Sequence, residues 1–106
     1  MGIIAIATYR PKSGQEDAFL ALLKTHVPTL RDQGLVTEQQ AYAMRSDNGT
    51  IVEVFEWVSE QAKRTAHDDP IVMDCWRKFF GLADIVSLDS LGEAKAPFAG
   101  FTRIEF

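Results

Sequence analysis

From a turn signal at position 46 to the end of a strand pattern at position 57, the chain reads Ser46-Asp47-Asn48-Gly49-Thr50-Ile51-Val52-Glu53-Val54-Phe55-Glu56-Trp57. The Asn48-Gly49 pair favours a tight hairpin turn, because these residues tolerate the positive φ angles that such turns require. Extended runs lie on both sides of the turn, at 36–45 and 50–57. The pattern therefore predicts two strands that pair antiparallel.

Two elements are expected before this hairpin. Residues 3–10 are short, apolar and β-branched, which predicts a first strand that ends at the turn 11–14. Apolar residues then recur every three or four positions over 15–32, which predicts a helix that Gly34 ends. Pro28 lacks a backbone N–H, so we expect the helix to bend in the turn that precedes it.

Four features are expected after the hairpin. A helix begins at the N-cap Ser59 and covers 59–67, and Asp68-Asp69-Pro70 interrupts it before a further helical stretch that Gly81 ends. Residues 85–91 are predicted to form a fourth strand. The tail 97–106 has enough apolar residues for a fifth strand or for an arm docked on a partner.

This order of elements, βαββαβ with a trailing strand, predicts an α+β domain of the ferredoxin-like class, with an antiparallel sheet and both helices on one face. The first strand is nevertheless apolar on both faces, with Ile3 and Ala5 on one side and Ile4 and Ile6 on the other. The helices of one chain cover one face only. We therefore expect a homodimer whose two sheets pack face to face.

Composition sets limits on function. The 106 residues, 46% of them hydrophobic, suit a single domain at 1–106, and the net charge of −4 argues against nucleic acid and membrane surfaces as partners. A basic leader and an apolar run of about 20 residues are both missing, so a cytoplasmic protein is expected. Cys75 is the single cysteine, which excludes an internal disulfide. The sequence has no phosphate-binding loop, flavin fingerprint or metal-ligand cluster, so we expect neither a cofactor nor a metal.

Five segments of the chain form a distinctive set: Arg10-Pro11-Lys12-Ser13-Gly14-Gln15-Glu16-Asp17, Val27-Pro28, Asp47-Asn48-Gly49, Phe55-Glu56-Trp57-Val58-Ser59-Glu60-Gln61-Ala62 and Asp69-Pro70. Together they resemble the antibiotic-biosynthesis-monooxygenase-like family of the dimeric α/β-barrel superfamily. The resemblance implies a homodimer in which two sheets close a barrel, and a pocket between the helices and the sheet of each subunit. The family includes cofactor-independent monooxygenases that oxidise anthrones and quinols, haem-degrading oxygenases, and members without a known activity.

The match to the family's functional residues is partial. Trp57 matches the tryptophan of anthrone-oxidising members, but their asparagine four residues earlier and tyrosine six residues later are Glu53 and Lys63 here. Haem-degrading relatives have a tryptophan and a histidine on the second helix, at positions that are Ala66 and Trp76 in this chain. The resemblance therefore implies a cofactor-independent monooxygenase that acts on a small aromatic or quinol substrate, and not haem degradation.

Glu53 and His26 are the candidate catalytic residues. Glu53 shares a strand face with Phe55 and Trp57, so on a helix-facing side it would have a raised pKa, which suits a base that deprotonates a phenol or quinol. His26 lies within the apolar stripe of the first helix, four residues before Leu30, and should point toward the sheet. The alternatives are a Glu53 that faces solvent at a strand margin or forms an ion pair, and a His26 that is a hydrogen-bonded core residue.

Aromatic residues supply the candidate substrate contacts. They are Trp57, Tyr9, Tyr42, Trp76 and Phe79. The tyrosines would donate hydrogen bonds and the others would form the walls of an aromatic pocket, although each is also a common core residue. A non-catalytic, small-molecule-binding or stress-related homodimer of the same fold is the alternative function. A cavity between helices and sheet that exposes Glu53 or His26 would favour the enzyme.

Overall fold

The predicted hairpin is present in the computed structural model, which describes residues 2–106. Strand β2 (Tyr42–Arg45) pairs antiparallel with β3 (Ile51–Trp57), and Met44 lies opposite Val52. Gly49 has a φ of 88° in the turn between them, a conformation that glycine adopts without strain. The turn chemistry and the strand pairing were therefore predicted correctly.

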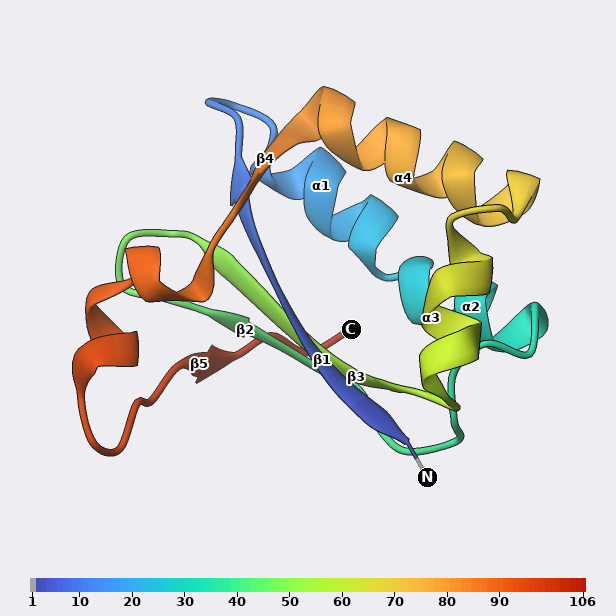
Figure 1. The fold of residues 1–106 in the computed structure, drawn as a ribbon. Helices are drawn as coiled ribbons and strands as arrows, with labels where there is room; N and C mark the ends of the chain where they lie inside the picture. Colours follow the sequence, from blue (N-terminus) through green and yellow to red (C-terminus); the bar gives the residue numbers. More distant parts are fainter. Residues whose placement is uncertain (1) are drawn as a thin grey trace.

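Three further strands complete one antiparallel sheet (Figure 1). Strand β1 (Ile3–Pro11) pairs with β3 along its length, and β4 (Ala83–Val86) pairs with the second half of β1. Strand β5 (Thr102–Arg103) pairs with β2 at the other edge. The resulting order is β4-β1-β3-β2-β5. The chain is thus an α+β domain, as predicted.

The predicted helix 15–32 is two helices, α1 (Glu16–Leu23) and α2 (His26–Asp32). The break falls within the turn before Pro28, where a bend was expected. Pro28 is the third residue of α2, a position whose N–H has no partner within a helix, so the proline costs little there. The Thr25 hydroxyl donates to the Leu22 carbonyl at 2.7 Å and so satisfies an acceptor at the break.

The second helical region also consists of two helices, α3 (Glu60–Ala66) and α4 (Pro70–Leu82). The Ser59 side chain accepts a hydrogen bond from the backbone N–H of Ala62, which confirms the predicted N-cap. The predicted end at Gly81 was wrong, because α4 continues through Leu82 before the chain turns extended at Ala83.

Two predicted strands are shorter than expected. The segment 36–45 pairs as a strand only from Tyr42, and Val36 makes an isolated bridge to Trp57. In place of a strand over 85–91, β4 ends at Val86 and two short 3-10 helices follow, η1 (Leu88–Ser90) and η2 (Gly92–Lys95). Side chains cause this turn: the Ser87 hydroxyl donates to Asp89, and the Ser90 hydroxyl donates to the carbonyl of Ser87.

The helices lie on one side of the sheet, and the core fills the space between the two layers (Figure 1). On the opposite face the side chains of Ile4 and Ile6 are 61% and 52% exposed. That face is covered at Thr8 and Val52, near the end of the sheet where η1 contacts β1. An apolar part of the outer face therefore remains open in the single chain. None of the helices in residues 2–106 has the length and apolar character needed to cross a membrane.

Candidate functional site

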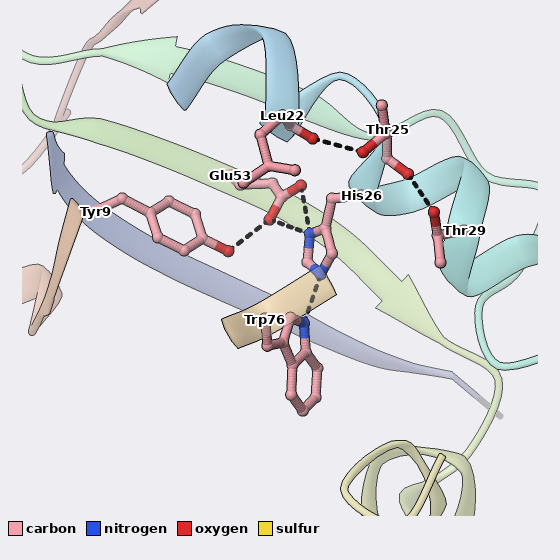
Figure 2. A network of polar contacts seen from close by, with 7 residues as sticks. All are labelled: Tyr9, Leu22, Thr25, His26, Thr29, Glu53 and Trp76. Carbon is pink, nitrogen blue, oxygen red and sulfur yellow. Dashed lines mark hydrogen bonds and ion pairs between the residues drawn. The ribbon is translucent and has the colours of Figure 1, made fainter. Parts of the chain in front are cut away.

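Four polar side chains form a buried hydrogen-bonded network between the sheet and the helices (Figure 2). Tyr9 comes from β1, His26 from α2, Glu53 from β3 and Trp76 from α4. The Tyr9 hydroxyl donates to Glu53 Oε1 at 2.8 Å, and His26 Nδ1 lies 2.9 Å from each Glu53 carboxylate oxygen. Trp76 Nε1 donates to His26 Nε2 at 2.9 Å. The two predicted catalytic residues are thus in direct contact.

The local structure explains why these side chains converge. Glu53 shares a face of β3 with Phe55 and Trp57, as the sequence indicated, and the structure shows that this face is turned toward the helices. Tyr9 is on the same face of β1, two residues along from the position opposite Glu53. His26 is the first residue of α2, so the break after Leu23 sets the point at which its ring enters the core.

The hydrogen bonds define the protonation pattern of His26. An indole N–H only donates, so Nε2 of His26 must be the acceptor in the contact with Trp76. Nδ1 therefore carries the hydrogen atom of the neutral ring and donates a hydrogen bond to Glu53. A carboxylate that holds Nδ1–H in this way orients the ring and stabilises a positive charge that forms on it, which is the arrangement found behind many catalytic bases.

Glu53 and Tyr9 are both protected from water. Glu53 is 3% exposed and His26 2%, so the carboxylate relies on its protein donors in place of solvent. Burial first, and then the nearby charge of Glu53, raises the pKa of Tyr9 far above its usual range. Tyr9 therefore remains a neutral hydroxyl donor. Glu53 Oε1 accepts from both Tyr9 and His26, and Oε2 accepts from His26.

An apolar cavity of about 250 Å³ lies between α4 and the sheet, and His26 is part of its wall. Its other walls are mainly aromatic and aliphatic side chains, among them Tyr9, Phe55, Trp57, Trp76, Phe79 and Ile85. The wall residues that carry side-chain polar atoms are His26, Tyr9, Trp57 and Trp76. A cavity of this size and character suits a small, flat, apolar ligand that is held by few polar contacts. We refer to it below as the apolar cavity.

A second cavity of about 370 Å³ lies on the other side of Glu53. Its wall carries charged residues, including Lys24, Arg31 and Arg103, and the C-terminal residues 104–106 also contribute. Tyr42 belongs to this second cavity, where its ring lies under the guanidinium of Arg103 at 5.2 Å. The predicted substrate residues therefore divide: Tyr9, Trp57, Trp76 and Phe79 line the apolar cavity, and Tyr42 does not.

Two features of the site were not predicted from the sequence. The pairing of His26 with Trp76 joins residues 50 positions apart, and only the docking of α2 against α4 brings them together. Ile85, predicted only as part of a strand, is 49% exposed and lines the apolar cavity.

The site contains no candidate metal ligands beyond the histidine and glutamate already described. Within residues 2–106, no cluster of three or more histidine, cysteine, aspartate or glutamate side chains has the geometry to hold a metal ion. Cys75 is a buried free thiol, and burial raises its pKa, which keeps it protonated and unreactive. His67, the C-cap residue of α3, is exposed and packs on the Trp76 ring at a centroid distance of 5.0 Å.

Comparison of the chain with protein-family models, with curated proteins and with solved structures finds no match in any of the three. The geometry of the site is therefore the basis for assigning a function.

Proposed function

We propose that this protein is a cofactor-independent monooxygenase of a small aromatic or quinol substrate, with His26 as the base. One observation carries the proposal: the His26 imidazole is held by Glu53 through Nδ1 and lines an apolar cavity. A base needs a neutral nitrogen that reaches the substrate and a partner that stabilises the charge it gains. His26 and Glu53 supply these two roles.

In the proposed reaction a ring C–H that is conjugated with a ring hydroxyl becomes a ketone; one atom of dioxygen becomes the ketone oxygen and the other leaves as water. His26 Nε2 removes the hydroxyl proton, and the phenolate, whose charge is shared with that ring carbon, transfers an electron to dioxygen. The substrate radical and superoxide join in a C–O bond at that carbon, and return of the proton from His26 gives a hydroperoxide. Loss of the hydrogen on that carbon as a proton then breaks the O–O bond, and the hydroxide that leaves takes up that proton as water. The substrate loses four electrons and dioxygen gains four, so the reaction balances. Hydroquinones and the enol form of anthrones both carry such a hydroxyl and such a carbon.

The surrounding residues support this chemistry. Glu53 stabilises the imidazolium that forms when His26 takes the proton, and the Tyr9 hydroxyl fixes the carboxylate in place. The rings of Trp57, Phe79 and Phe55 exclude water, which strengthens the electrostatic interactions inside the cavity.

The same proposal includes the ferredoxin-like assignment and the homodimer. The order of the first four strands in the sheet, β4-β1-β3-β2, supports the ferredoxin-like arrangement. Exposed Ile4 and Ile6 on the outer face support a second copy that packs sheet against sheet and closes a barrel. A cytoplasmic location is part of the proposal and is supported by the single, unpaired Cys75.

The test is oxygen consumption with anthrones and hydroquinones, comparing wild type with His26→Gln and Glu53→Gln. We expect both variants to lose about 10²- to 10⁴-fold in rate, because a glutamine amide neither accepts the proton nor stabilises the imidazolium. The matched control is Asp74→Asn, which neutralises an exposed carboxylate on α4 that pairs with Arg77 and Lys78. Wild-type rates in both site variants would remove His26 and Glu53 from the mechanism.

One observation favours the alternative function, a non-catalytic small-molecule-binding homodimer. The lone pair of His26 Nε2 is already occupied by the Trp76 N–H, so in this state the base has no free acceptor. If anthrones and hydroquinones bind in the cavity but no oxygen is consumed, the binding function is correct and the oxygenase is not.

A further inference from the structure

The hydrogen bond between Trp76 and His26 is made at the point where a substrate would have to bind. Trp76 Nε1 lies 2.9 Å from His26 Nε2, and both side chains form part of the wall of the apolar cavity. The indole presents to this nitrogen a planar aromatic ring with one N–H donor. A phenol presents the same combination, a planar ring with one O–H donor.

We propose that Trp76 acts as an internal substitute for the ligand, so that the apolar cavity selects aromatic rings that carry a hydrogen-bond donor and can displace the indole from His26. This inference rests on the proposed function for its chemical consequence, because deprotonation requires the displaced state. The selective binding of such rings depends only on the contact between Trp76 and His26, and not on the oxygenase chemistry. Trp76 is therefore a specificity-determining residue that holds the base unavailable until a suitable ring arrives.

The surroundings of Trp76 are consistent with displacement. Glu53 and His26 are almost fully buried, whereas Trp76 lies at the edge of the core and is only partly buried, so its ring has more freedom to move than that of His26. The exposed side of the indole packs on His67, which is itself exposed. By contrast, His26 is held by Glu53 and is packed edge to face against Phe79 and Phe55. The contact between the two side chains therefore opens by movement of Trp76.

The donor requirement follows from the cost of an unpaired acceptor. A ring without a donor that displaced the indole would leave the buried Nε2 lone pair without a partner, and such a group loses its hydration without compensation. A phenol or quinol replaces the lost bond. The apolar walls bind both kinds of ring equally well, so the difference in affinity comes from this single hydrogen bond.

The experiment compares matched pairs of ligands, phenol with anisole and hydroquinone with 1,4-dimethoxybenzene, by calorimetric titration. Wild-type protein is expected to bind each donor more tightly than its methyl ether, by about two- to tenfold for one net hydrogen bond. Trp76→Phe keeps an aromatic ring but removes the competing donor. It is expected to tighten phenol binding by a similar factor, because phenol no longer has to break an existing bond to His26.

Trp57→Phe is the matched control, because it also removes an indole from the wall of the same cavity but leaves the contact to His26 intact. Its ratio of phenol to anisole affinity is expected to equal that of wild type. Equal affinities of wild type for phenol and anisole, absence of binding for both, or a Trp76→Phe variant that binds phenol as wild type does would each overturn the inference.

A measurement on unaltered protein covers the case in which the variant does not fold. In ¹⁵N-labelled wild type, the indole N–H of Trp76 should exchange with water faster when phenol is bound than when anisole is bound, because phenol releases it from His26. Oxygen consumption is recorded separately. Donor-selective binding without oxygen consumption refutes the oxygenase and leaves Trp76 as the selector, whereas turnover of donors and ethers alike refutes the selector.

Discussion

His26 Nδ1 lies 2.9 Å from both carboxylate oxygens of Glu53, although 27 positions separate the two residues in the chain. Both side chains are almost completely buried, so the contact is made in a region of low dielectric constant. Removing either partner therefore affects stability as well as chemistry, and the two effects can be separated by the choice of substitution.

Glu53→Ala is expected to lower the free energy of unfolding by about 3–5 kcal/mol, because it leaves the Tyr9 hydroxyl and the His26 Nδ1–H without an acceptor. Glu53→Gln keeps one amide oxygen as an acceptor in the same place, so its loss should stay below about 2 kcal/mol. Urea unfolding at neutral pH measures both. A Glu53→Ala protein that matches the glutamine variant in stability would show that the network contributes little to the fold.

Tyr9 gives the protein a specific sensitivity to alkaline pH. Because its pKa is raised in the folded state, Tyr9 keeps its proton there, while the unfolded chain loses it above about pH 10. The stabilisation is complete below about pH 10 and decreases as the pH rises further, by up to about 1.4 kcal/mol per pH unit.

The measurement is the urea midpoint of wild type and Tyr9→Phe between pH 8 and pH 11. The variant is expected to be less stable at pH 8, since it loses the bond to Glu53, and the difference should shrink as the pH rises above about 10. Cys75 is present in both proteins, so its contribution to the pH dependence cancels when their stabilities are subtracted. Tyr42→Phe, which alters a tyrosine that is 42% exposed, is the control. A difference that is constant over this pH range contradicts the prediction.

Asp69 is expected to be the more important of the two adjacent aspartates before α4. Its side chain accepts hydrogen bonds from the backbone N–H groups of Ile71 and Val72, at 2.9 and 3.2 Å. Asp69→Ala should cost about 1 kcal/mol, the usual effect of losing an N-cap. Asp68→Ala alters an exposed residue beside the cap and should change stability by less than about 0.5 kcal/mol. Thermal unfolding distinguishes them, and equal losses would assign no capping role to Asp69.

The proposed dimer is tested with a charge on the outer face of the sheet. Ile4→Lys places an ammonium group where a second sheet would pack, so we expect it to convert a dimer into a monomer of 11.9 kDa. Ile71→Lys is the control, because Ile71 is 55% exposed on α4, on the helical side of the sheet. Analytical ultracentrifugation gives the masses. A wild-type protein that sediments as a monomer rules out the dimer.

The elements predicted correctly are those whose signals are local. The Asn48-Gly49 turn, the alternation of β3 and the Ser59 cap each depend on a few neighbouring residues, and each appears in the structure as expected. The predicted start of β2 and the predicted end of β4 were wrong. Those boundaries depend on which strand lies alongside and on side-chain hydrogen bonds such as that of Ser90, and neither is visible in hydrophobic periodicity.

The sequence identified the residues of the network but not their contacts. Strand parity placed Glu53 on the same face of its strand as Phe55 and Trp57, and the apolar stripe directed His26 toward the sheet, so both were identified as candidates. Their partners, Tyr9 and Trp76, were identified only as aromatic residues. The distances between the four side chains depend on how α2 and α4 cross the sheet, and no spacing within the sequence encodes that crossing.

The network also limits how the strands can slide against each other. Ala7 of β1 lies opposite Glu53 of β3 in the observed register. A shift of β3 by one residue would turn Glu53 to the outer face and bring Val54 to His26, leaving the imidazole N–H without an acceptor. Alternating apolar residues alone would tolerate such a slip, since both faces of β1 and β3 carry them. The buried carboxylate thus disfavours incorrect strand registers, because only the observed register gives it hydrogen-bond partners.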